Sequence, residues 1–451
     1  MNGASIGTAL KWFDQLLQFV NGSGPILILS LFFVAPDWAT AQGGQEHPID
    51  GALLPTRTTL LQIASEKWTG LPKSYRLPGH VDLRADLPPP GDQGRQNSCI
   101  AWALAYGTKS YLQAKRTGLA PVDTTGRMDP TRTFSPAYPY NLTKKDFDTA
   151  DVKCLGSHFD RVFSVLVEQG CCTWSDMPYD PDPKGCFQAV PARSSAVALR
   201  HTMATPLRVS PWELDQLRFH LAQGTPVSFA MGIDTAFKYG GKRAAVSGVP
   251  FSWRPECAAP MPGSHAMLAV GYDDADSSFL IMNSWGTAWG EGGYCRLRYD
   301  VFDCHVTEAY VARDPMPAPE EPVVFDEAVD KATSGRRLKA KLSPGSTANV
   351  RSLTLGLAQH DPESDRVLLM VRDTSASEGI QMLDLIEDRP VRLFNGDEMV
   401  TVTYTKASRT NNVRRIRAHI VAVVEDKGVD PCVERAISQA ARIRSARASH
   451  P

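Results

Sequence analysis

Three residues in this chain have the types and order that thiol chemistry requires. Cys99, His265 and Asn283 follow one another, the last within Asn283-Ser284-Trp285-Gly286. A thiol becomes a strong nucleophile when a neighbouring imidazole takes its proton, and a third polar group can fix the imidazole tautomer. We therefore interpret Cys99 as a candidate nucleophile, His265 as its base and Asn283 as the group that orients the base.

The residues around Cys99 predict a helix that begins at the thiol. Ser98 is a favourable N-cap, and an apolar face follows it, with Lys109 among the polar residues off that face. Cys99 would then lie in the first turn, where the helix dipole favours a thiolate. Gln93 is near enough in sequence for its amide to bind an oxyanion together with the Cys99 N–H.

The segment that contains His265 predicts a β-hairpin. Apolar residues 266–270 and 279–282 flank a polar turn at residues 273–276, and Asn283 ends the second run. Such a hairpin would bring Asn283 beside His265, where its carboxamide could accept the imidazole N–H. Trp285 could then cover that hydrogen bond and exclude water.

Residues from about 80 to 312 resemble a papain-like, cathepsin-type cysteine peptidase domain. The resemblance rests on residues 81–84, Gln93-Gly94, Ser98-Cys99, Met177-Pro178-Tyr179, the His265 strand and the block from Asn283 to Tyr294. It assigns Cys99 as nucleophile, His265 as base and then acid, Asn283 as orienter and Gln93 as oxyanion donor. It also implies that Gly156 and Ser157 bind substrate backbone, with Trp285 beside them.

The same resemblance implies an α+β fold for residues 80–313. A helical left lobe and a β-barrel-like right lobe would face each other, with Cys99 and His265 on opposite sides of the cleft. It also implies a disulfide from Cys257 to Cys304 or Cys295. The chain departs from the family at Gln96, where a cysteine is usual, and at Ile100, where an aromatic residue is usual.

The segments before residue 80 predict export. Residues 1–41 contain a short apolar core and end in Ala39-Thr40-Ala41, which is typical of a signal peptide, so we expect a secreted or periplasmic protein. Residues 42–79 are interpreted as a short prosegment that could inhibit the enzyme in cis, or as a structural extension. They include an expected short helix over residues 59–68.

The segments after residue 313 predict an added domain. Residues 314–335 form a proline-rich linker, and residues 336–427 alternate as a small all-β sandwich or barrel. Expected strands are 351–357, 366–371, 399–405 and 415–424, with a turn at residues 395–397. Residues 428–451 are expected to be a basic helical tail, whose arginines would face solvent.

Composition sets limits on partners and cofactors. The formal net charge is −1, so no overall field favours nucleic acid or an anionic membrane, and we predict neither a nucleic-acid partner nor a specific membrane partner. With one of the nine cysteines free as nucleophile, eight remain for disulfides in an oxidising compartment. The cysteine spacing predicts no metal site, and no cofactor is needed.

These observations predict an exported cysteine endopeptidase that hydrolyses peptide bonds through a thioacyl-enzyme on Cys99. Its expected partners are protein or peptide substrates. Two alternatives remain: a transpeptidase that uses the same site, and a catalytically silent papain-fold protein that binds ligands.

Overall fold

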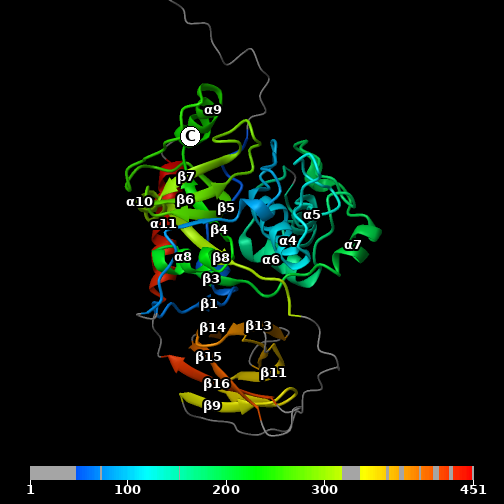
Figure 1. Cartoon of the computed structure of the whole chain (residues 1–451), viewed down its shortest axis with the longest axis vertical. Coiled ribbons are helices and arrows are strands. Elements are labelled where there is room, and N and C mark those ends of the chain that lie inside the picture. The colour runs from blue at the N-terminus through cyan, green and yellow to red at the C-terminus, as the bar shows by residue number, and fades with distance from the viewer. Residues whose placement is uncertain are drawn as a thin grey trace, which may run out of the picture. The chain divides into compact units, whose positions relative to one another are not determined.

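A computed structural model describes residues 47–71, 74–151, 153–316, 336–361, 365–374, 380–395, 398–409, 416–425 and 430–448. The expected signal peptide, most of the linker and most of the turn at residues 395–397 lie outside these ranges. The described residues divide into a helical lobe, a β lobe and a C-terminal β-domain, joined by two short N-terminal elements and a C-terminal helix (Figure 1). No helix among them is long and apolar enough to span a membrane.

The helical lobe is built around the helix that begins at Cys99. Its elements are α3 (Cys99–Ala101), η3 (Trp102–Lys109), α4 (Ser110–Thr117), α5 (Ala137–Asp146), α6 (Phe159–Glu168), η4 (Gly185–Phe187) and α7 (Ala192–Ala198). The segments α3, η3 and α4 run on without a break, and η3 is π-helical. Gly118 closes α4 at φ 69°, a left-handed conformation that glycine adopts at low cost.

Lys109 differs from its predicted position on a polar face. The residue is buried, and its Nζ donates to Asp314 Oδ1 at 2.5 Å and to the Thr202 carbonyl at 2.8 Å. A buried ammonium is tolerated because both partners satisfy it. The expected linker therefore starts with a residue, Asp314, that is held against the helical lobe.

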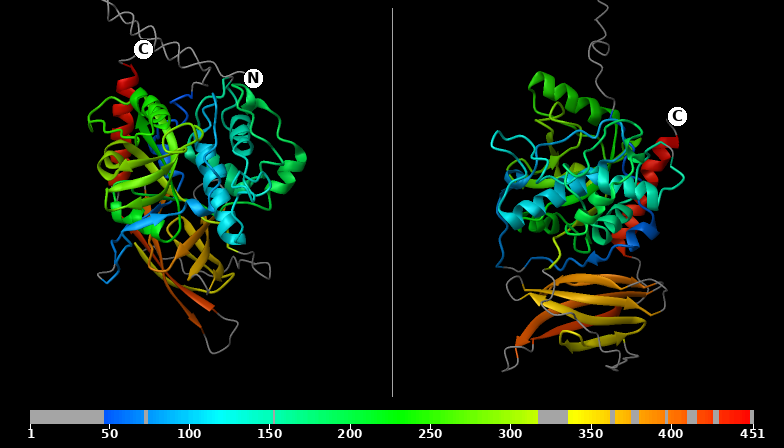
Figure 2. Two further views of the ribbon diagram at one scale, coloured as in Figure 1. Left: turned by 45° about the horizontal axis from the view of Figure 1, so that its top comes forward. Right: turned by 90° about the vertical axis from the view of Figure 1, so that its right-hand side faces the viewer.

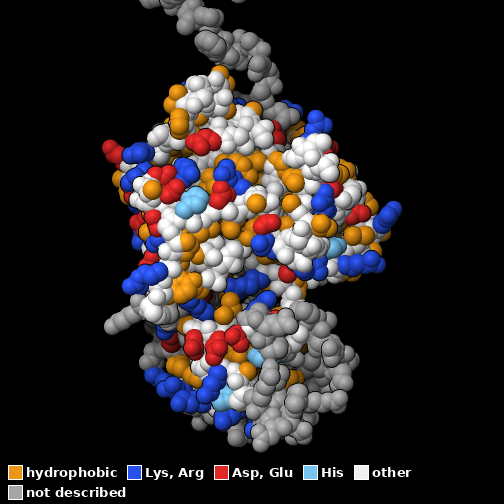
Figure 3. Space-filling model, in the orientation of Figure 1, with side chains coloured by type: hydrophobic (Ala, Val, Ile, Leu, Met, Phe, Trp, Pro, Cys, Tyr) orange, Lys and Arg blue, Asp and Glu red, His pale blue; other side chains and the backbone are white. Residues whose placement is uncertain are grey.

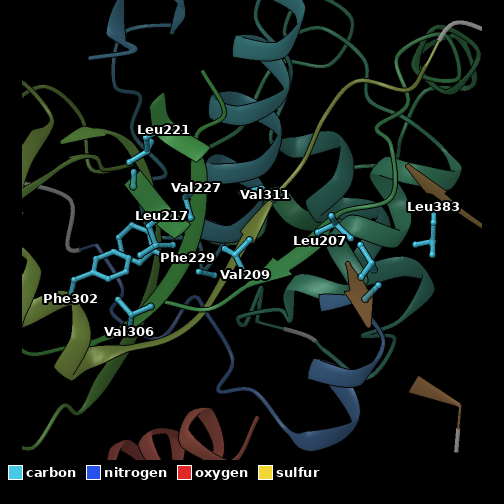
Figure 4. Close-up of a cluster of buried hydrophobic side chains, with 14 of the residues drawn as sticks. Leu207, Val209, Leu217, Leu221, Val227, Phe229, Phe302, Val306, Val311 and Leu383 are labelled. Atoms are coloured by element: carbon cyan, nitrogen blue, oxygen red, sulfur yellow. The ribbon is translucent and has the colours of Figure 1, made fainter. Parts of the chain in front are cut away.

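The β lobe contains strands that are mostly antiparallel, with helices at its edges. Its elements are β2 (His80–Asp82), η2 (Arg84–Asp86), β3 (Leu207–Val209), α8 (Leu214–Ala222), β4 (Val227–Ile233), α9 (Thr235–Ser247), β5 (Gly263–Asp273), β6 (Ser278–Met282), β7 (Tyr294–Arg298), α10 (Tyr299–His305) and β8 (Val306–Val311). The strand order is β7-β6-β5-β4-β8-β3, and β2 pairs with β5. Apolar side chains from β3, β4, β8, α8 and α10 form the core drawn in Figure 4.

The C-terminal domain is all β. Its strands are β9 (Arg337–Leu342), β10 (Thr347–Val350), β11 (Leu353–Asp361), β12 (Arg366–Asp373), β13 (Gln381–Ile386), β14 (Val391–Asn395), β15 (Glu398–Arg409) and β16 (Ile416–Glu425). One sheet has the order β10-β11-β12-β13, the other has β14-β15-β16-β9, and their apolar faces share one core. Both sheets are visible below the helical and β lobes in Figure 2. Four of these strands correspond to predicted ones, and β9, β10, β13 and β14 were not predicted.

A two-residue strand joins the C-terminal domain to the β lobe. This strand, β1 (Ser65–Glu66), follows the short helix α2 (Arg57–Leu61) and pairs with β3 on one side and β14 on the other. Glu66 is buried, and its Oε2 accepts from Gln216 and lies 2.6 Å from His220 Nε2. The helix predicted over residues 59–68 is therefore shorter and gives way to a strand.

The C-terminal helix α11 (Pro431–Ala448) runs along the strands of the β lobe (Figures 1 and 2). Its arginines were expected to face solvent, and Arg435, Arg442 and Arg444 are exposed. Arg435 also pairs with Asp303, whereas Arg447 is half-buried and pairs with Asp50. Basic and acidic side chains are interspersed on the face shown in Figure 3, in keeping with the small net charge.

Two disulfides form, Cys154–Cys186 and Cys257–Cys304. The second is one of the two pairings that the family resemblance implied. Cys171, Cys172 and Cys295 are free and buried, so the even number of remaining cysteines did not indicate complete pairing.

Candidate functional site

Cys99 is the first residue of α3, but its expected cap is absent. Ser98 occupies the N-cap position without a side-chain cap bond, and its Oγ lies 2.7 Å from the hydroxyl of Tyr179. The Tyr179 hydroxyl also reaches the Gln93 carbonyl at 2.8 Å. The loop before Cys99 is thus held by a side chain rather than by helix capping.

The Gln96 side chain holds the same loop. Its Nε2 donates to the Asp182 carbonyl at 2.8 Å and also to the Asp180 carbonyl. These bonds tie the loop to residues near η4 at the position where the family usually has a cysteine.

The thiol of Cys99 lies inside the protein. Its Sγ accepts a hydrogen bond from the backbone N–H of Ala266 at 3.3 Å, and the residue is fully buried. Burial raises the pKa of Cys99 to about 12, because a thiolate would lose its hydration. The thiol is therefore protonated in this state.

His265 and Asn283 are brought together by the β5–β6 hairpin. The Oδ1 atom of Asn283 lies 2.8 Å from Nε2 of His265 and also accepts the N–H of Ser284 at 2.7 Å. Nδ1 of His265 is buried and has no hydrogen-bond partner within the described ranges. One ring nitrogen is thus held by Asn283, and the other is available for proton transfer.

Trp285 covers the His265 ring. The two rings are stacked, with centroids 4.5 Å apart and an interplanar angle of 28°. His47 also stacks on Trp285, at 5.7 Å. Burial lowers the pKa of His265 to about 4, partly offset by the Asn283 bond, so the imidazole is neutral at pH 7.

Gln93 lies in the same network. Its Oε1 accepts from Ser284 Oγ at 2.6 Å, and its Nε2 donates to the Gln96 carbonyl at 2.8 Å. A carboxamide carries two N–H donors, so one remains for a ligand. Ser284 fixes the amide orientation, a contact that sequence reasoning missed although Ser284 lies within the recognised block.

Residues 47–54, which we call the strap, lie across the thiol. The strap bonds to both lobes: Ser157 N–H donates to the Gly51 carbonyl at 3.2 Å, and Ser264 N–H donates to the Ile49 carbonyl at 2.7 Å. The Leu53 N–H in turn donates a hydrogen bond to the Ser157 carbonyl at 2.9 Å. The strap therefore forms backbone hydrogen bonds with Ser157 in the helical lobe and with Ser264 in the β lobe, on both sides of Cys99.

Glycines allow the strap to approach so closely. A Cβ at Gly51 would lie 2.6 Å from Cys99 Sγ, and a Cβ at Gly156 would lie 2.7 Å from the Gly51 carbonyl oxygen. Side chains at either position would force these segments apart. Gly156 and Ser157, which the resemblance assigned to substrate backbone, thus contact the chain's own backbone here.

A groove of about 470 Å³ runs beside the strap. The strap lines it together with Asn97, Leu155 and Gly156 of the helical lobe side, Lys238 of α9 and Arg447 of α11. The sequence predicted that residues 42–79 could inhibit the enzyme in cis, but it did not single out residues 47–54. It also gave no role to His47, whose Nε2 lies 2.7 Å from Asp92 Oδ1. No group of three or more metal-binding side chains occurs among the residues described.

Comparison with known proteins finds similarity to one family. Residues 139–313 match the model of the papain family cysteine proteases, a range that includes His265 and Asn283 and begins after Cys99. This region is papain-like. The papain-like region is 27% identical over 180 residues to cathepsin B-like CP2 of Giardia intestinalis, covering 39% of this chain and 55% of that protein.

A further relative and a solved structure are both named as cysteine proteases. Senescence-specific cysteine protease SAG12 of Arabidopsis thaliana is 29% identical over 239 residues, covering 51% of this chain and 59% of that protein. Each of these two relatives is thus matched over little more than half of its length. Among solved structures, xylellain, a cysteine protease from Xylella fastidiosa, aligns with TM-score 0.46 and 23% identity over 55% of this chain and 92% of its own.

Proposed function

We propose that this protein is a cysteine endopeptidase that is held inactive by its own N-terminal strap. The proposal rests above all on the hydrogen bond of 2.8 Å between His265 and Asn283, in a hairpin whose next residue, Ala266, donates to the Cys99 sulfur. The relatives are cysteine proteases, which supports the peptidase class.

In the proposed reaction, His265 takes the proton of Cys99 and the sulfur attacks a peptide carbonyl. The Cys99 N–H and the remaining N–H of Gln93 bind the oxyanion. His265 then gives its proton to the leaving amine, and the thioacyl-enzyme is hydrolysed by a water that His265 activates. Asn283 holds the imidazole throughout.

The strap supports an inactive resting form. It places Gly51 over the Cys99 sulfur and forms hydrogen bonds with the backbone groups of Ser157. With the strap in this position, the Cys99 thiol and the His265 imidazole are both neutral. A substrate needs the same space and the same backbone groups. We therefore assign the strap as the inhibitory part of residues 42–79, in a protein exported by residues 1–41.

The test uses the chain from residue 42 and its Cys99→Ala variant, incubated with a peptide library before and after limited proteolysis. The proposal expects cleavage after proteolysis in the first protein and none in the variant. Joined peptides in the product spectra would indicate a transpeptidase. Peptide binding without turnover after strap removal would indicate a silent binding protein.

A further inference from the structure

The last two turns of α11 bind the strap and the residue that follows it. The Arg447 guanidinium lies 2.9 Å from the Asp50 carboxylate, next to the glycine that covers Cys99. Arg444 donates to the Pro55 carbonyl at 3.1 Å, just beyond the strap. Two arginines of α11 thus contact the middle of the strap and the residue that follows it.

The first half of α11 binds α2, the element that continues from the strap. Leu60, Val433 and Ala436 form a fully buried cluster, against which Leu61, Trp212 and Ile437 pack. Arg57 pairs with Glu434 at the edge of this cluster. Apolar burial of this kind contributes more than exposed ion pairs, so α2 is held firmly by the helix.

The helix itself is anchored on the β lobe. Gln439 Nε2 donates to the Cys304 carbonyl at 2.7 Å, and Arg435 pairs with Asp303 at 2.6 Å. Asp430, just before the helix, is buried between Arg208 and Arg392, each at 3.3 Å. These contacts involve neither the strap nor α2, so α11 is held independently by the β lobe and by Arg392 of β14.

We propose that α11 is a clamp that holds the strap in the cleft. This regulation rests on the proposed function, because a clamp matters only if the strap blocks a working site. Without α11, α2 would lose Val433, Ala436 and Ile437 from its buried cluster, so residues 47–64 would form a looser tether whose closed state is entropically less favourable. Loosening α11 should therefore open the cleft without any cut in the strap.

The test measures access to the Cys99 sulfur in the uncut chain. The protein from residue 42 is treated with iodoacetamide at pH 7.5, and labelling of the Cys99 peptide is followed by mass spectrometry. The double variant Arg444→Ala, Arg447→Ala removes the strap contacts and leaves the contacts of α11 with the β lobe and Arg392 intact. Two lost contacts of this kind should speed labelling on the order of 10-fold.

The matched control is Arg442→Ala, which truncates an exposed arginine on the same helix that forms no ion pair with the residues the structure describes. It should label at the wild-type rate. Labelling of the unfolded chain in urea sets the upper limit. A charge exchange, Asp50→Arg with Arg447→Asp, should slow labelling again relative to Arg447→Asp alone, which a general loss of stability would not do.

A double variant that labels as slowly as the wild type would overturn the clamp. A different outcome would contradict the proposed function. In that outcome, Cys99 is labelled rapidly in the double variant, but neither that variant nor the proteolysed protein cleaves peptides. Access and turnover thus report separately on the clamp and on the peptidase.

Discussion

Gly51 lies so close to Cys99 that a Cβ atom on it would be 2.6 Å from the sulfur. The approach is closer than a Cβ and a buried sulfur tolerate, so the occluded state depends on glycine at this position. Main-chain atoms of the strap cover the sulfur. Since main-chain atoms are the same in every residue, no sequence motif indicates this contact.

Gly51→Ala should therefore loosen the strap. Overpacking of a closed contact typically costs about 1–3 kcal/mol, which predicts Cys99 labelling roughly 5- to 100-fold faster than in the wild type. Gly79→Ala is the control, because a Cβ there has no neighbour within 4 Å. Equal labelling of both variants would show that the strap does not limit access to the sulfur.

Asn283→Ala should lower kcat/KM on the order of 10²-fold once the strap has been removed, chiefly through kcat. The reason is that Nε2 of His265 would lose the acceptor at 2.8 Å that fixes the tautomer. Steady-state kinetics with a peptide identified in the library experiment provide the measurement. An unchanged kcat would remove Asn283 from the mechanism.

Acid should open the strap. In the occluded state burial lowers the pKa of His265 to about 4, and exposure to water would return it toward its ordinary value of 6.5. The open state then binds more protons between pH 6.5 and pH 4, so falling pH favours opening, by up to about 3 kcal/mol. In the occluded state the Cys99 thiol stays protonated throughout this range, because burial raises its pKa to about 12.

Hydrogen exchange of the strap amides, corrected for intrinsic pH dependence, measures this opening. His265→Gln should make the exchange ratio nearly independent of pH over this window. His47 also contacts Trp285 and Asp92 beside the site, so the same measurement on His47→Gln is the second control. Exchange that slows on acidification in both backgrounds would contradict the prediction.

Glu66→Gln should reduce stability at neutral pH. Although burial opposes ionisation, His220 and Gln216 lower the pKa of Glu66 to about 2. Because this pKa is below the ordinary 4.5, the stabilisation is present above pH 4.5 and is lost as pH falls toward 2. At pH 7 the free energy of unfolding of the variant should be lower than that of the wild type by about 2–3 kcal/mol. Urea unfolding at pH 7 and at pH 3 should show that this difference is smaller at pH 3.

The hairpin at His265 could be predicted because its signals are local. Two apolar runs and a polar turn specify the pairing, and the structure has β5 and β6 where they were expected, with Asn283 after the second strand. The helix α6 has the same local character, because its buried residues Phe159, Val162, Phe163 and Leu166 recur at helical spacing within the element. In both cases the residues that determine the element lie within it.

An inhibitory role for residues 42–79 was expected, but the exact residues that cover Cys99 and the burial of Lys109 could not be predicted. The strap is held by backbone hydrogen bonds to Ser157 and Ser264, which any sequence can form, and residues 47–54 have no strand or helix periodicity. Lys109 is buried because Asp314, 205 residues later, returns to meet it. Such long-range partners leave no pattern around the residue itself.

The strand β1 has a topological consequence for maturation. Its two residues pair with both β3 and β14, so they join the strands of the β lobe and those of the C-terminal domain in one continuous sheet. A cut at the exposed residues Thr56–Thr58 would free the occluding peptide while everything from β1 onward stayed in place. The new amino terminus would lie at α2, beside α11, so the matured molecule would keep part of residues 42–79 as a structural joint between β3 and β14.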